Sequence, residues 1–92
     1  MLEETGVGSL KLVVADGGAE VEGALREHVP DADLRQFGEG AWVAYTDVEP
    51  AEIRDWIAAA VGNDAPVFVV EFERWSAFGD AIDRAWLLRR GH

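Results

Sequence analysis

Few residues of this chain could act as catalytic groups. It contains no cysteine, and its two histidines, His28 and His92, lie far apart in the sequence. No serine or threonine lies in the turn or triad context that nucleophilic enzymes use. Structural zinc sites combine several histidine or cysteine ligands, which two distant imidazoles do not supply. The sequence therefore predicts no catalytic residues, no metal site and no cofactor.

One turn could hold a small ligand. Asp16-Gly17-Gly18 follows a strand-like apolar run and has the composition of a tight turn. It resembles the glycine-containing loop between the first strand and first helix of amino-acid-sensing regulatory domains. That resemblance implies a ligand carboxylate held by backbone N–H groups of the loop. As an alternative function we therefore consider a small-ligand sensor, with Asp16, Gly17, Gly18, His28 and Tyr45 as ligand-binding residues.

A second alternative is a cofactor-free enzyme of the dimeric α+β-barrel type, in which two sheets enclose a pocket. Trp42, Tyr45, His28 or Asp16 would have to line that pocket. An apolar pocket that converges on His28 or Tyr45 would favour this hypothesis over the others.

Aromatic and arginine side chains gather near the C-terminus. A mixture of tryptophan, phenylalanine and arginine is typical of the centre of a protein–protein interface. The same side chains could instead attach a C-terminal helix to the rest of the protein, because tryptophan rings and arginine stems cover apolar surface. The candidate partner-binding residues are Arg74, Trp75, Phe78, Trp86, Arg89 and Arg90.

The charge is unevenly distributed. The net charge of the chain is −10, which disfavours direct binding to nucleic acid or to an anionic membrane. Residues 74–92 carry four arginines and two aspartates, whereas residues 1–73 carry four basic and sixteen acidic residues. This pattern favours a protein partner with a basic surface, or a C-terminal segment that lies against the acidic part of the same protein.

These residues must be positioned by a small set of helices and strands. Hydrophobic periodicity predicts the order β-α-β-β-α-β, the split βαβ pattern of the ferredoxin-like fold, with an additional C-terminal helix. We expect a single α+β domain over residues 1–92, with a flexible leader at 1–9 and a core at 10–75. The expected strands are Leu10–Ala15, Ala32–Phe37, Ala41–Thr46 and Val67–Trp75, and the expected helices are 19–29, 51–61 and 80–90.

Turn and capping residues define the helices. Pro30 ends the first, Pro50 and Gly62 bracket the second, and Asp80 with Asp83 resembles a capping box that opens the third. We expect the first two helices to cover one face of the sheet, and Trp75–Leu88 to cover part of the other, within the chain or across a dimer. The predicted core is Leu12, Val14, Leu25, Val29, Val43, Ile53, Ile57, Val61, Phe68 and Val70.

The sequence favours a small acidic, non-enzymatic binding or regulatory protein that acts by contact with another protein, as an inhibitor or accessory subunit. A homodimer formed through the sheet fits the same pattern. The acidic N-terminus lacks the layout of a secretory signal, and no apolar run is long enough to span a bilayer. Together with the absence of cysteine, this predicts a cytoplasmic protein.

Overall fold

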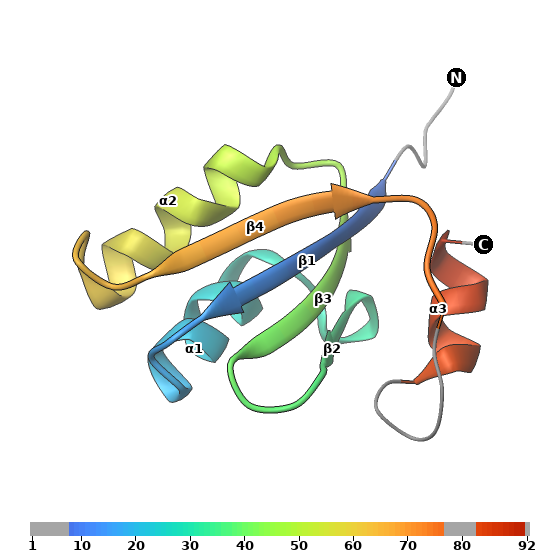
Figure 1. Ribbon diagram of the computed structural model, residues 1–92, viewed down its shortest axis with the longest axis horizontal. Coiled ribbons are helices and arrows are strands. Elements are labelled where there is room, and N and C mark those ends of the chain that lie inside the picture. Colours follow the sequence, from blue (N-terminus) through green and yellow to red (C-terminus); the bar gives the residue numbers. More distant parts are fainter. Residues whose placement is uncertain (1–7, 77–82, 92) are drawn as a thin grey trace.

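A four-stranded antiparallel sheet with helices on it makes up the α+β structure of this protein (Figure 1). The computed structural model describes residues 8–76 and 83–91. The elements are β1 (Ser9–Ala15), α1 (Ala19–His28), a 3-10 turn (Asp31–Asp33), β2 (Leu34–Gln36), β3 (Ala41–Thr46), α2 (Pro50–Val61), β4 (Val67–Phe72) and α3 (Arg84–Gly91). This order of helices and strands confirms the one predicted from periodicity.

The two βαβ units of the chain are interleaved in the sheet. The strand order is β2-β3-β1-β4, and each pair of neighbouring strands is antiparallel. Strand β3 therefore lies between β1 and β2, which α1 connects. In the same way, β1 lies between β3 and β4, which α2 connects.

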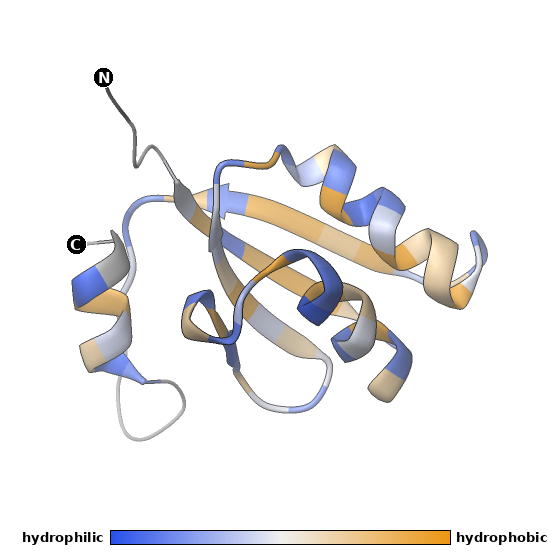
Figure 2. Ribbon diagram, turned by 180° about the vertical axis from the view of Figure 1, so that it is seen from behind, coloured by the Kyte–Doolittle hydropathy of each residue, from blue (hydrophilic) through white to orange (hydrophobic). Residues whose placement is uncertain are grey.

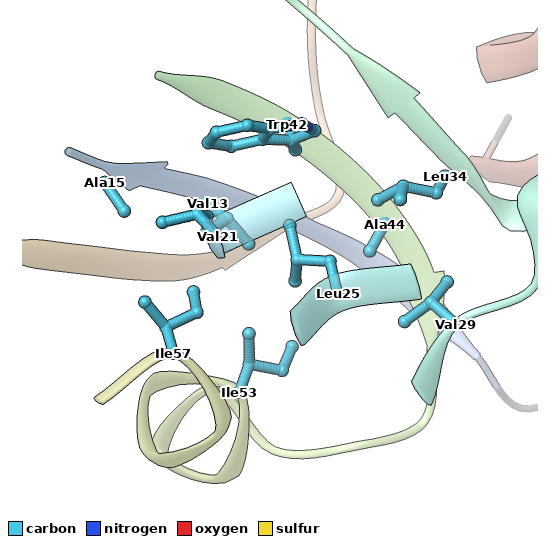
Figure 3. Packing of buried hydrophobic residues seen from close by; sticks show 10 residues of the cluster. All are labelled: Val13, Ala15, Val21, Leu25, Val29, Leu34, Trp42, Ala44, Ile53 and Ile57. Atoms are coloured by element: carbon cyan, nitrogen blue, oxygen red, sulfur yellow. The ribbon is translucent and has the colours of Figure 1, made fainter. Parts of the chain in front are cut away.

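Helices α1 and α2 cover one face of the sheet, which we call the helical face. The apolar stripes of the two helices, with Leu25 from α1 and Ile53 and Ile57 from α2, point at the sheet (Figure 3). Trp42 and Ala44 of β3 complete this core from the sheet side. Gly62 ends α2 with φ 97°, and its N–H donates to the carbonyl oxygen of Ala58, as the sequence predicted.

The predicted strand residues of this core were wrong by one position. Leu12, Val14, Val43, Phe68 and Val70 were expected beneath the helices. Instead Val13, Ala15, Trp42 and Ala44 are buried there, with Val67 and Val69 packed against them. Strands β1 and β4 carry apolar side chains on both faces, so that alternation does not show which set faces the helices. A shift of one residue then moves each side chain to the opposite face.

The opposite face, which we call the open face, is covered at one end by α3. Leu10 of β1 and Val43 of β3 are buried there against Trp86 and Leu87. This confirms that part of the Trp75–Leu88 segment covers the second face, and it does so within the chain. Figure 2 shows hydrophobic colouring along β1 and β4 and hydrophilic segments on α1 and α2.

Three boundaries differ by two or more residues from those expected, and the others differ by at most one residue. Helix α3 begins at Arg84 and is capped by the Asp83 side chain, whereas Asp80, the other residue of the predicted capping box, lies outside the described residues. The strand expected from Ala32 begins at Leu34, after the 3-10 turn. Strand β4 ends at Phe72, before Trp75. In the part of the chain that the structure describes, no helix has the length and hydrophobicity needed to cross a membrane.

Candidate functional site

Two surfaces on opposite sides of the sheet combine features expected of a binding site. The first is a groove between α1 and α2, on the outer side of the helical layer, with a volume of about 490 Å³. The second is the uncovered half of the open face. Residues of α1 and α2 line the groove, whereas alternate residues of β1 and β4 form the uncovered half of the open face.

Aromatic rings stack at the edge of the groove between α1 and α2. His28 is the last residue of α1, and Trp56 lies in the middle of α2. Their ring centroids are 4.0 Å apart with an angle of 10° between the planes, so the imidazole lies flat on the indole. The His28 side chain is nevertheless exposed to solvent.

Small residues and carboxylates line the rest of this groove. Gly23, Ala24, Ala59 and Ala60 leave its floor shallow, and none of the described residues that line it is a lysine or an arginine. Three acidic residues, Glu20, Glu27 and Asp55, surround that floor. The Asp55 carboxylate pairs with the neighbouring Arg54 at 3.0 Å, whereas no described residue forms an ion pair with Glu20. The groove is therefore apolar at its base and negatively charged at its rim.

The uncovered half of the open face consists of apolar side chains from the two strands β1 and β4. Val14 and Phe68, which are directly opposite each other in the register, are 43% and 59% exposed. Leu12 and Val70, the next pair on this face, are partly buried. Between these residues and α3 lies a smaller apolar hollow of about 190 Å³, lined in part by Phe37, Phe72 and Leu87.

A set of polar contacts fixes α3 at its end of the open face. The indole Nε1–H of Trp86 donates to the carbonyl oxygen of Ala32 at 2.5 Å, and the Arg35 guanidinium lies 5.2 Å from the centre of the same ring system. Arg35 Nε also lies 3.5 Å from Asp83 Oδ2. Asp83 Oδ1 accepts the backbone N–H of Trp86 at 3.1 Å, which caps the helix.

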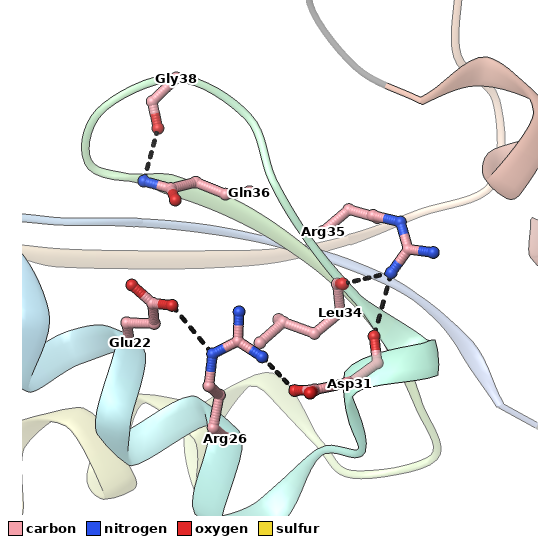
Figure 4. A network of polar contacts seen from close by, with 7 residues as sticks. All are labelled: Glu22, Arg26, Asp31, Leu34, Arg35, Gln36 and Gly38. Carbon is pink, nitrogen blue, oxygen red and sulfur yellow. Dashed lines mark hydrogen bonds and ion pairs between the residues drawn. The ribbon is translucent and has the colours of Figure 1, made fainter.

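These contacts also change the pKa of Asp83. The pKa of Asp83 is lowered, first because its carboxylate accepts the Trp86 N–H and then because Arg35 lies beside it. Arg35 is itself held by the chain, since its Nη1 donates to the carbonyl oxygens of Asp31 and Leu34 (Figure 4). The same figure shows Arg26 of α1 bound to Glu22 and to the Asp31 side chain.

The turn at Asp16–Gly18 lines a pocket of about 370 Å³ together with Trp42. Gly17 has φ 146°, and a Cβ atom there would lie 2.8 Å from a methyl group of Val21, so that only glycine fits. Asp16, Glu22 and Glu39 line the pocket, and its described lining contains no lysine or arginine. Glu22 is paired with Arg26, whereas Asp16 and Glu39 form no ion pair with any described residue. These two carboxylates repel a ligand carboxylate, which disfavours the amino-acid-sensor hypothesis.

Lys11 is the one buried charged residue among those described, and it is 2% exposed. Its Nζ donates to Ser9 Oγ at 2.6 Å and to the Thr46 carbonyl oxygen at 2.8 Å, and it pairs with Glu71 at 3.3 Å. Lys11 lines neither the α1–α2 groove, nor the pocket at Asp16–Gly18, nor the two hollows on the open face. The lysine thus joins β1, β3 and β4 rather than facing a ligand.

The residues singled out in the sequence are divided among several places. Trp86 is fully buried and Trp75 packs beside it, so both attach α3 to the sheet, whereas Arg74 and Arg89 are exposed. Phe78 and the side chain of Arg90 lie outside the described residues.

The five alternative ligand-binding residues do not share one pocket. Asp16, Gly17 and Gly18 lie together, but His28 is on the outer side of the helices and Tyr45 packs on the open face. The residues that sequence reasoning missed are Val14, Phe68 and the carboxylates of the α1–α2 groove. The run Val67–Val70 was the available signal for Phe68, since a strand apolar on both faces needs cover on both.

Among residues 8–76 and 83–91, no cluster of three or more histidine, cysteine, aspartate or glutamate residues could hold a metal ion. No protein-family model, no curated protein and no solved structure matches this chain.

Proposed function

We propose that this chain is a small acidic, non-enzymatic binding module that acts as an inhibitor or accessory subunit by contact with a basic surface of another protein. The observation that carries the proposal is the groove between α1 and α2, where a stacked His28–Trp56 pair meets a rim of three carboxylates. A chain without cysteine needs no oxidising compartment to form disulfides, so a cytoplasmic location is compatible with the proposal.

Charge and shape at this groove both favour a cationic partner. The net charge of −10 attracts basic proteins over long range and raises their association rate. At short range, the exposed ring of the His28–Trp56 stack gives an arginine guanidinium a flat surface on which to pack. The shallow floor at Gly23 and Ala60 lets the backbone of a partner approach closely.

The same proposal includes a ferredoxin-like fold. The interleaving of the two βαβ units, with β3 between β1 and β2 and β1 between β3 and β4, supports this arrangement. The fold alone implies no activity, so the functional proposal rests on the groove.

The experiment identifies the partner first and then tests the groove. A photo-crosslinking amino acid in place of Ala60, which lines the groove, should capture the partner in cells, whereas the same group in place of Asn63 should not. The captured protein is then purified, and its dissociation constant is measured against the variants below at low and high salt.

Two triple variants remove the same number of charges from different places. Glu20→Gln with Glu27→Gln and Asp55→Asn neutralises the groove, and Asp47→Asn with Asp64→Asn and Glu73→Gln neutralises exposed carboxylates elsewhere. We expect the groove variant to raise the dissociation constant by about tenfold, equal to ~1.4 kcal/mol, and the control by less than about threefold. Equal effects of the two variants would contradict a site in the groove.

A further inference from the structure

All the large hydrophobic side chains that are exposed in the described chain belong to the same side of the sheet. They are Val14, Phe37, Phe68 and Leu88. Val14 and Phe68 stand on the uncovered half of the open face, Phe37 lines the hollow beside α3, and Leu88 is on α3 itself. The α1–α2 groove is on the other side of the sheet, so these four residues belong to a separate surface.

Helix α3 has a second side that the chain does not bury. Trp86 and Leu87 face the sheet, whereas Arg84, Ala85, Leu88 and Arg89 are all exposed. Residues at i, i+1, i+4 and i+5 share one face of a helix, so Leu88 lies between two arginines on the outer side of α3. This outer side is apolar in the middle and basic at its edges.

The uncovered half of the open face has the opposite charge at its far end. A hollow of about 400 Å³ there is lined by Val14 and Phe68 together with Asp16 and Glu39. In the part of the chain that the structure describes, no lysine or arginine lines this hollow. The open face therefore has a basic, leucine-bearing helix at the end near Leu10 and an acidic, apolar hollow at the end near Val14.

We infer that the open face is the interface of a homodimer with two-fold symmetry. In it, the outer side of α3 from each copy packs on the uncovered half of the open face of the other. Leu88 then contacts the surface around Val14 and Phe68, and Arg84 and Arg89 lie near Asp16 and Glu39. Both ends of each copy are used, as a self-complementary two-fold contact requires.

The uncovered half of the open face is long enough along the strands to hold α3 of a second copy. Leu10, which α3 covers, and Val14, which it does not, are four residues apart along β1, or roughly 13 Å at about 3.3 Å per residue. A helix is about 10 Å across with its side chains, so one further helix fits beside α3 over the uncovered strands.

Electrostatics also favour a second copy over an unrelated protein. The acidic and basic parts that must meet are both present on this one face, and a two-fold rotation brings each onto the other. The overall charge of −10 on each copy opposes association, but at physiological ionic strength charges more than about 8 Å apart are largely screened. The short-range contacts between arginines and carboxylates are then the stronger term.

The test uses charge reversal in the full chain, with the mass measured by analytical ultracentrifugation. We expect the natural chain, of 10.1 kDa, to sediment as a dimer. Arg84→Glu with Arg89→Glu, and separately Asp16→Arg with Glu39→Arg, should each raise the dimer dissociation constant at least tenfold. An equimolar mixture of the two variants should form heterodimers, because each acidic surface again meets a basic one.

Controls separate this contact from a change in fold or in total charge. Asp47→Arg with Asp64→Arg changes the charge by the same amount as the second variant but should leave the dimer intact. Phe68→Asp changes a position that is 59% exposed, so this variant should be folded by circular dichroism and monomeric by ultracentrifugation. It tests the interface even if the substitution at Asp16 unfolds the turn.

A monomeric natural chain, or reversed variants that do not recover on mixing, would overturn the inference. None of these substitutions alters a residue that lines the α1–α2 groove, so failure of the dimer can be distinguished from failure of the proposed function.

Discussion

The indole N–H of Trp86 donates a hydrogen bond to the carbonyl oxygen of Ala32, which is 54 positions earlier in the chain. This bond joins α3 to the 3-10 turn before β2, and Arg35 lies over the same indole ring. The C-terminal helix is therefore held by a specific polar contact as well as by apolar packing, and it belongs to the folded structure.

Two substitutions of Trp86 should separate the contribution of its hydrogen bond from that of its packing. Trp86→Phe removes the hydrogen bond and should lower the free energy of unfolding by about 1 kcal/mol. Trp86→Ala also opens a cavity against Leu10 and Val43 and should cost about 3–5 kcal/mol in urea denaturation. Leu88→Ala on the same helix is the control, with an expected change within about 0.5 kcal/mol for the monomer. Equal costs for Trp86→Ala and Leu88→Ala would show that α3 is not attached in this way.

The cap of α3 should make stability depend on pH. The folded pKa of Asp83 is lowered by the Trp86 N–H and by Arg35, so the ionised form is favoured in the folded state. Its contribution is present above the unfolded pKa of about 4 and is lost as the pH falls through the lower folded pKa. The stability difference between the natural chain and Asp83→Asn should therefore be larger at pH 6 than at pH 2.5 in denaturant titrations. A difference that stays constant between these pH values would contradict a role for the charge.

The two faces of β1 can be distinguished with neighbouring valines. Val13 is fully buried under the helices, whereas Val14 is 43% exposed on the open face. Val13→Ala should cost about 2 kcal/mol, because two buried methyl groups are lost and a cavity remains. Val14→Ala should change the stability of the monomer by less than about 0.5 kcal/mol. A larger loss of stability for Val14→Ala than for Val13→Ala would show that Val14 faces the helices, as predicted from the sequence.

This pair also shows how far the sequence determines the fold. The core residues Leu25 of α1 and Ile53 and Ile57 of α2 were predicted correctly, because the polar and apolar residues of these helices separate with a clear period. Val13 and Val14 carry no such information, since either could face the helices. Contacts between distant parts of the chain, such as Arg35 with Trp86, and the groove made by His28 and Trp56 depend on how the elements pack together. No local pattern contains them.

The buried Lys11 should matter more than its acidic partner. Lys11→Ala removes the hydrogen bond to the Thr46 carbonyl and the packing of the side-chain stem, and should cost roughly 2–4 kcal/mol. Glu71→Gln should cost less than about 1 kcal/mol, because the Glu71 side chain is 52% exposed and water can replace it. Thermal and chemical denaturation of the two variants would check this order, and a larger loss for Glu71→Gln would contradict it.

The groove between α1 and α2 can be tested directly by nuclear magnetic resonance with a short oligo-arginine peptide as a cationic probe. Amide and indole signals are followed during the titration at moderate salt. We expect the largest shifts at Gly23, Ala60 and the indole of Trp56, all of which line the groove. Shifts spread evenly over the exposed acidic residues, or concentrated at Asp47 and Glu73, would contradict a binding site in the groove.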